Sequence, residues 1–473
     1  MVYIMNDRFM AVKRIGFAIL SQGLMGVMSV VFGFILPKAM GPEQYGYYQE
    51  YAFYALYLNI VGLGINDGLA LNYAGKSTES VPKERIRRAL KAEGIYLLIP
   101  TTLLIIISIF NSNPNKGFVL LMLAISIIPT VLFCVENGLF LMNNNSITYN
   151  LVNVINRGLF CAAVVLLLIF KIHDYHYVIL VAVLTGMLMA VLVLPKCKTF
   201  FCGEMESWKN GIDECKKLSQ SGISIMLSVV LMGLIPTFGR IVVEHYETIV
   251  EYGVFSFYMG LLSIVLSFTN AIGTVAFPMM RNTSFDWLKN NYNKLEQLYA
   301  ILACGALFSY VVVSMVVEVF MPNYSEGIGY FPILFTSCYP LGKIQMLIFP
   351  YLKTMRKEKE AFRINIIAMF VSLLTVGGMY YCFRSIYAIA IGTTVSCVVY
   401  YLLYQFFIYT MLRNRVANKD IIYSTIIDLV TPIVFVVLAS VFNKVSFIFF
   451  YSVYLLVLII MYIRNGRLSC NVD

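Results

Sequence analysis

Residues 15–37 read IGFAILSQGLMGVMSVVFGFILP, a run of 23 residues without one charged side chain. A helix needs about 20 consecutive apolar residues to cross the hydrocarbon core of a bilayer. The run is too long for the apolar part of a secretory signal peptide, and no cleavage site of small residues follows it. We therefore expect residues 15–37 to form a first membrane helix that is retained.

The rest of the chain has the same character. Of its 473 residues, 60% are hydrophobic and 13% are charged, against roughly 45–50% and 25% in a soluble domain. Apolar runs between short polar breaks predict an all-α integral membrane protein of about fourteen membrane helices, with no soluble domain beside them. These runs are residues 15–37, 45–72, 93–112, 118–142, 151–170, 177–195, 220–243, 249–280, 295–321, 329–352, 364–382, 387–410, 423–442 and 445–463.

The cationic residues predict the orientation of these helices. With the N-terminus in the cytoplasm, 27 of the 35 Lys and Arg residues fall on cytoplasmic segments, five on the opposite face and three inside helices. Cytoplasmic loops of membrane proteins carry such an excess. We expect a multi-pass membrane protein with both termini in the cytoplasm. The net charge of +10 then reflects orientation, and no nucleic-acid partner is expected.

Two short motifs recur with an offset of 207 residues. Residues 24–26 (LMG) and 45–46 (YG) reappear as residues 231–233 and 252–253. Six helices per repeat is an even number, which predicts two lobes related by an axis along the membrane normal. A chance match of common residues is the alternative to this interpretation.

The repeat predicts a domain organisation. The N-terminal lobe would cover residues 1–200 and the C-terminal lobe residues 201–415, followed by helices thirteen and fourteen with a cytoplasmic tail in residues 416–473. Residues 5–14 and 205–218 mix apolar and charged side chains ahead of the first helix of each lobe. Such segments are typical of helices that lie in the headgroup plane, although an ordinary solvated loop would have the same composition.

Three cations lie inside predicted membrane helices: Arg240, Lys343 and Arg157. An ionisable group is costly in hydrocarbon and usually faces a cavity or a partner. Arg in particular matches phosphate oxygens in a bidentate way, so we predict that these residues bind an anionic substrate. Pairing with an acid inside the membrane is the alternative for each cation, and the two roles do not exclude one another.

Acids in the predicted helices are candidates for coupling transport to an ion. Glu136 and Asp67 are the candidates for binding a coupling ion or proton, and the other membrane acids are Glu50, Glu318 and Asp428. Helix-breaking residues favour moving parts, because backbone groups freed by proline need a cavity or a neighbour. They are Pro236, Pro278, Pro340 and Pro350, and the first helix is expected to end at Pro37 and Gly41-Pro42.

Catalysis and metal binding have little support. His173 and His176 form a His-x-x-His pair without the Glu that a zinc protease motif requires, and Cys197, Cys202 and Cys215 share a polar loop without a histidine. No phosphate-binding glycine loop or nucleophile elbow is present. We expect no enzyme activity, no cofactor and no metal.

The first two helices resemble a known family. Residues 21–49 (SQGLMGVMSVVFGFILPKAMGPEQYGYYQ) and 59–76 (NIVGLGINDGLALNYAGK) are similar to bacterial polysaccharide transporters, the O-antigen and capsule flippase branch of the multidrug/oligosaccharidyl-lipid/polysaccharide exporter superfamily. The turn in residues 40–48 (MGPEQYGYY) carries most of the likeness. Relatives often have an acid just before the cation at Arg240, whereas this chain has Gly239.

The resemblance implies a function. It implies two six-helix lobes around a central cavity, plus two further helices, in the plasma (inner) membrane of a bacterium. These lobes would move a polyprenyl-diphosphate-linked oligosaccharide across that membrane by alternating access. Its partners would be this lipid-linked substrate, membrane lipids and other membrane proteins of polysaccharide assembly. The alternatives are an ion-coupled multidrug exporter of the same superfamily, a flippase of peptidoglycan precursors, or a membrane glycan polymerase or ligase.

Overall fold

The computed structural model describes residues 2–74, 81–143, 145–281, 283–412 and 418–464, and these residues form helices and connections without a strand. The chain divides into two compact units, residues 1–230 (the N-unit) and 231–473 (the C-unit). The division falls inside the long helix α8 (Trp208–Tyr246). The C-unit includes the two C-terminal helices that the repeat leaves outside its second lobe.

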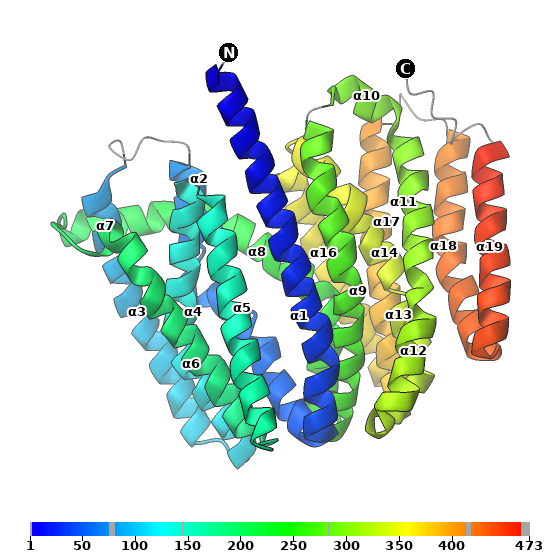
Figure 1. Ribbon diagram of the computed structural model, residues 1–473, viewed down its shortest axis with the longest axis horizontal. Coiled ribbons are helices and arrows are strands. Elements are labelled where there is room, and N and C mark those ends of the chain that lie inside the picture. The colour runs from blue at the N-terminus through cyan, green and yellow to red at the C-terminus, as the bar shows by residue number, and fades with distance from the viewer. Residues whose placement is uncertain (1, 75–80, 144, 282, 413–417, 465–473) are drawn as a thin grey trace. The chain divides into compact units, whose positions relative to one another are not determined.

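The N-unit is built around α4. This helix packs against α1, α2, α3, α5 and α6, and Figure 1 shows α3, α4, α5 and α6 running side by side. The elements of the N-unit before α8 are α1 (Val2–Ala55), the 3-10 turn η1 (Leu58–Gly62), α2 (Ile65–Tyr73), α3 (Lys83–Ile109), α4 (Pro114–Met142), α5 (Ser146–Ile169), α6 (Tyr175–Val193), η2 (Leu194–Cys197) and α7 (Lys198–Phe201).

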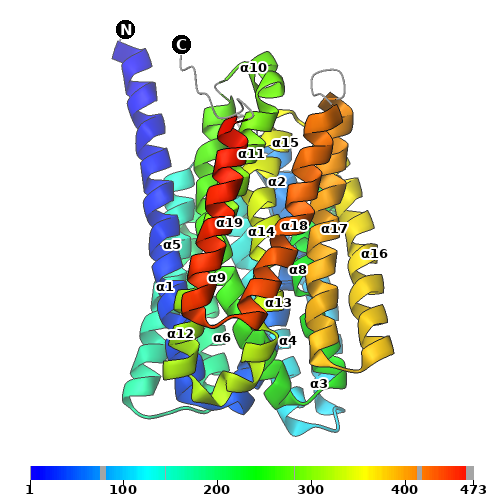
Figure 2. The same cartoon turned by 90° about the vertical axis from the view of Figure 1, so that its right-hand side faces the viewer.

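The C-unit continues from α8 with a second set of packed helices. Helix α17 packs against α16, and the last two helices pack against each other and against α11, as Figure 2 shows for α18 and α19. Its elements are α9 (Ile249–Arg281), α10 (Phe285–Asn290), α11 (Tyr292–Leu307), α12 (Ser309–Phe320), η3 (Pro322–Gly329), α13 (Phe331–Phe335), α14 (Cys338–Lys343), η4 (Ile344–Ile348), α15 (Phe349–Thr354), α16 (Glu358–Phe383), α17 (Ile386–Leu412), α18 (Asn418–Val441) and α19 (Lys444–Arg464).

Twelve continuous helical segments in the described part of the chain are long and apolar enough to span a membrane. Two predicted membrane helices are not separate members of this set, because each is interrupted. The helix predicted at 45–72 is divided between the end of α1, η1 and α2, and its first part is counted with the first span. The helix predicted at 329–352 is built from α13, α14 and α15, with the π-helical turn η4 between α14 and α15. The prediction of an all-α integral membrane protein is confirmed.

The break predicted at Pro37 and Gly41-Pro42 lies at Gly41 and not at Pro37. Helix α1 runs through Pro37 and bends at Gly41, where the φ angle is 74°, a left-handed value that favours glycine. The two predicted interfacial segments also merge with the membrane helices next to them: residues 5–14 belong to α1 and residues 208–218 to α8. Separate helices are absent there because no breaking residue divides either segment from the apolar run after it. The side chains of residues 5–14 lie outside the described part of the structure.

Glycines allow η1, α2 and α8 to meet at backbone distance. Leu63 and Gly64 both have positive φ angles, 51° and 74°, and so break the chain between η1 and α2. A Cβ atom on Gly222 of α8 would collide with the Gly64 carbonyl, and one on Gly68 would collide with the Leu218 carbonyl. Close helix packing through small residues is a common device in membranes, and it fixes the first part of α8 to the rest of the N-unit.

Some of the cations whose distribution predicts the orientation of the helices also fix the loop that precedes α8. Arg85 forms an ion pair of 3.0 Å with Glu206, and Arg87 donates hydrogen bonds of 3.0 and 2.7 Å to the carbonyls of Thr199 and Glu204. Hydrogen bonds from Asn210 and Arg85 hold the pKa of the Glu206 carboxyl below its usual range. The start of α3 is therefore tied to the segment that leads into α8.

The glycine contact predicts a difference between two Gly→Ala variants. Gly222→Ala should destabilise the protein by about 1–3 kcal/mol, because the added methyl group meets backbone that cannot move aside. Gly186→Ala in α6 meets nothing within 4 Å and should leave stability unchanged or slightly higher. Thermal unfolding of the two purified proteins in detergent measures this difference. An equal melting temperature for the two variants would contradict the packing.

Candidate functional site

A buried ionic cluster lies in the C-unit around Lys343. The side chain of this lysine, at the end of α14, is 1% exposed. Its ammonium group forms ion pairs with Glu296 of α11 and, at 2.6 Å, with Asp428 of α18. One cation therefore connects three helices that are far apart in the sequence.

Hydroxyl groups satisfy the remaining oxygens of the two acids. Tyr339 and Tyr401 donate hydrogen bonds of 2.5 and 2.6 Å to the two oxygens of Asp428, and Ser424 donates one of 2.9 Å to Glu296. The ring of Tyr401 lies 4.8 Å from the ammonium nitrogen, a distance at which the face of an aromatic ring attracts a cation. A buried ion pair is tolerated only when its remaining lone pairs and protons are satisfied in this way.

The cluster shows that Lys343 has the acid partners considered as one of its two roles. The structure shows pairing with acids and no exposed face of the ammonium group. Asp428 is one of the membrane acids noted in the sequence, but Glu296 is not. It lies next to the predicted start of its helix at residue 295, whereas α11 begins at Tyr292, so the sequence placed it too near the helix end to stand out.

Arg240 is also buried, with 6% of its surface exposed. Its guanidinium donates a hydrogen bond of 3.3 Å from Nη2 to the carbonyl of Ser256 on α9. Glycine at the preceding residue 239 avoids a close contact, because a Cβ atom there would lie 2.6 Å from the hydroxyl oxygen of Thr393. A side chain at residue 239 would require Thr393 to move.

Arg157 is placed differently from the other two cations. It lies midway along the 24-residue helix α5, and its side chain is exposed. The predicted helix began at residue 151, which placed Arg157 near the cytoplasmic end. Because α5 begins at Ser146, the residue lies farther from the start of its helix than expected. It forms no ion pair with a described carboxylate, although the half-buried Tyr48 lies close enough to interact with its charge.

Acids of the N-unit surround its central helix. Glu136 of α4 is 0% exposed, and neither of its carboxylate oxygens has a hydrogen-bond partner among the described residues. Asp67 of α2 is half-buried and lies, with Glu93 of α3, near the thiol of Cys134. Glu93 is 4% exposed, and it was not predicted as a membrane acid because it is the first residue of the helix expected at 93–112.

The described residues contain no group of three His, Cys, Asp or Glu side chains that could hold a metal ion. His176 instead forms a hydrogen bond of 2.6 Å between its Nδ1 atom and Asp174, which caps the start of α6.

The ionic cluster predicts unequal effects of removing its members. Lys343→Met leaves two buried carboxylates facing each other and should destabilise the C-unit by about 3–5 kcal/mol. Glu296→Gln leaves Lys343 paired with Asp428 and should lower the stability of the C-unit clearly less. The loss of folded protein with temperature, followed by size-exclusion chromatography of both variants, tests this order. A Glu296→Gln variant as unstable as Lys343→Met would contradict it.

Solved structures of membrane transporters share the fold. The lipid II flippase MurJ in an inward closed conformation is 15% identical, covers 94% of this chain and 97% of its own, and superposes with a TM-score of 0.68. An inward-facing multidrug resistance MATE family transporter of the MOP superfamily is 16% identical over 84% of this chain and 96% of its own, with a TM-score of 0.58. A ligand complex of the MATE multidrug transporter DinF-BH is 12% identical over 87% and 96%, also with a TM-score of 0.58.

At sequence identities this low, the solved structures establish the fold alone. No curated protein sequence matches the chain significantly. The family model described as polysaccharide biosynthesis protein matches residues 11–284, more than half of the chain. The chain thus has the fold of the MOP transporter superfamily and belongs to the polysaccharide biosynthesis protein family.

Proposed function

We propose that the protein is a flippase that moves a polyprenyl-diphosphate-linked oligosaccharide, a repeat unit of O-antigen, capsule or exopolysaccharide, across the bacterial plasma membrane by alternating access. The family match and the transporter fold support a role in polysaccharide export. The observation that carries the proposal is Arg157, an exposed cation halfway along a membrane helix without a described acid in contact.

An arginine in this position needs a polar environment or an anion. A cation at the centre of a membrane helix costs about 2.5–3.5 kcal/mol by insertion measurements, and Arg157 has no described carboxylate to offset that cost. A diphosphate group would supply two or more oxygens for the guanidinium fork. The lipid tail of such a substrate would remain in the bilayer while its diphosphate moves past Arg157.

The three cations have different roles in this proposal. Arg157 and the buried Arg240 remain the candidates for diphosphate or acidic-sugar contacts. Lys343 is neutralised by Glu296 and Asp428, so we assign it to holding α11, α14 and α18 together. An exposed arginine at mid-membrane would repel the cationic compounds that a multidrug exporter carries, so the flippase is preferred to that alternative.

The acids of the N-unit are the candidates for ion coupling. A fully buried carboxylate without hydrogen bonds from described residues, as Glu136 has, is stable only if a proton or a cation neutralises it. Asp67 is the second candidate, because its side chain is only half-buried. We propose that Glu136 binds and releases the coupling ion.

Replacing Arg157 tests the substrate contact. Arg157→Gln should reduce surface glycan at least tenfold and cause lipid-linked repeats to accumulate on the cytoplasmic leaflet, while Arg157→Lys keeps the charge but not the fork and should be intermediate. Surface glycan, lipid-linked intermediates and protein level are measured together in cells that lack the native gene. Lys196→Gln removes another exposed cation and serves as the control. Normal glycan in cells with Arg157→Gln would show that the site assignment is wrong.

Replacing Glu136 tests the coupling role. Glu136→Gln keeps the shape of the side chain but cannot gain or lose a proton, so transport should no longer respond to an imposed pH or sodium gradient. Transport into proteoliposomes is measured with and without each gradient, and Glu204→Gln, a change of an exposed loop acid, is the control. A gradient response that survives in Glu136→Gln would exclude this residue as the coupling group.

A further inference from the structure

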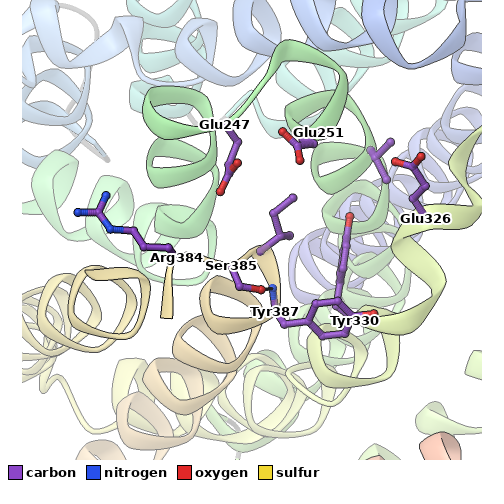
Figure 3. A pocket seen from close by; sticks show the side chains of 9 residues that line it. Glu247, Glu251, Glu326, Tyr330, Arg384, Ser385 and Tyr387 are labelled. Carbon is purple, nitrogen blue, oxygen red and sulfur yellow. Dashed lines mark hydrogen bonds between the residues drawn. The ribbon is translucent and has the colours of Figure 1, made fainter. Parts of the chain in front are cut away.

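A polar pocket of about 310 Å³ lies in the C-unit at the connection between α8 and α9, beside η3 and the turn between α16 and α17 (Figure 3). The charge pattern of the sequence predicts that all three connections are on the outer side of the membrane. Three acids, one arginine and two tyrosines line most of it: Glu247, Glu251, Glu326, Arg384, Tyr330 and Tyr387.

Tyr330 presents a fixed hydroxyl group to this pocket. The residue is only 4% exposed, and its ring packs against those of Phe255, Tyr258 and Tyr387 with centroids 6.0, 5.7 and 5.7 Å away. Its hydroxyl has no hydrogen-bond partner among the described residues. A buried polar group without a partner destabilises the fold, and a ligand that bonds to it would offset that cost.

The acids beside this hydroxyl supply hydrogen-bond acceptors. Glu251 is held in place because its Oε2 accepts hydrogen bonds from the backbone N–H and the hydroxyl of Thr248, at 2.9 and 2.8 Å. This arrangement leaves Oε1 of Glu251 available to a ligand. Glu326 is exposed and forms no hydrogen bond with a described side chain. Two acceptors therefore line the same pocket as one buried hydroxyl.

The chemistry of the lining selects the class of ligand. The described acids are not grouped closely enough to hold a metal ion. Carboxylates accept hydrogen bonds from the hydroxyl groups of a sugar, the phenol can accept or donate one, and aromatic rings offer an apolar face. Three acids against one arginine favour a neutral or amino-bearing sugar and disfavour an acidic one.

A second pocket, of about 470 Å³, adjoins the first one at Arg384. Its lining is mainly aromatic and aliphatic, and the Arg384 guanidinium lies 5.6 and 5.7 Å from the rings of Tyr380 and Tyr381. A polar pocket and an apolar pocket that share Arg384 suit an amphiphilic ligand whose anionic group lies between its sugar and its lipid.

We propose that the polar pocket is a saccharide-binding site, selective for neutral or amino sugars, that receives the glycan part of the substrate on the outer side. This inference rests on the proposed flippase function and adds to it a second sugar contact, separate from Arg157. The sugar hydroxyls bond to Tyr330, Glu251 and Glu326, and the lipid-proximal part of the substrate lies toward Arg384.

Saturation-transfer NMR with the full-length protein in nanodiscs tests the proposal. The probes are glucosamine, N-acetylglucosamine, glucuronate and, as a cation without a sugar ring, spermidine. We expect signal from glucosamine and N-acetylglucosamine, at least threefold less from glucuronate, and at least a threefold loss of the sugar signal in Tyr330→Phe. Tyr177→Phe removes the hydroxyl of an exposed tyrosine elsewhere and should leave the signal unchanged.

Three results would overturn the site: no transfer to any sugar, equal transfer to glucuronate, or a sugar signal that Tyr330→Phe does not reduce. Transfer to spermidine alone would show a site for organic cations and would also contradict the proposal. None of these results bears on the flippase function, which is tested separately by the glycan output of Arg157→Gln. A second variant, Glu326→Gln, changes an exposed side chain that the fold does not require. It should reduce the difference in transfer signal between glucosamine and glucuronate.

Discussion

The cost of leaving a charge without a partner in hydrocarbon explains the placement of the ionisable residues in this chain. Lys343 meets that cost with two carboxylates and a shell of hydroxyl groups, and its ammonium group is fully engaged by these described side chains. Arg157 has no described carboxylate of its own unit in contact. The same constraint therefore distinguishes Lys343, which is paired and stabilises the fold, from Arg157, which we propose binds an anion of the substrate.

The ionic cluster also changes the role of the C-terminal helices. The repeat treats helices thirteen and fourteen as an addition to two complete lobes. Asp428 of α18 nevertheless contributes one of the two carboxylates around Lys343, and Tyr451 of α19 donates a hydrogen bond of 3.1 Å to the carbonyl of Cys304 on α11. The last two helices are thus part of the C-unit core and would move with it during any transport cycle.

Sequence patterns predicted the helices better than their interruptions or their contacts. Apolar length places α4, α6, α16, α17 and α19 within a few residues, because hydropathy depends on composition alone. The breaks at Gly64 and at η4 depend on backbone geometry, which the hydropathy of a stretch of sequence does not reflect. Glu296 and Glu93 were missed because charged residues beside a predicted helix end look like solvated caps, whereas the helices in the structure extend beyond them.

The decisive experiment for transport of an anionic glycolipid is reconstitution of the purified chain in liposomes. These liposomes contain a fluorescent prenyl-diphosphate disaccharide in both leaflets, and an impermeant reductant bleaches the outer leaflet. A flippase should allow bleaching of well beyond half of the label with the wild-type protein, against only about half in protein-free liposomes and with Arg157→Gln. Bleaching that stops at about half with the wild-type protein, under every ion gradient imposed, would contradict the proposed transport.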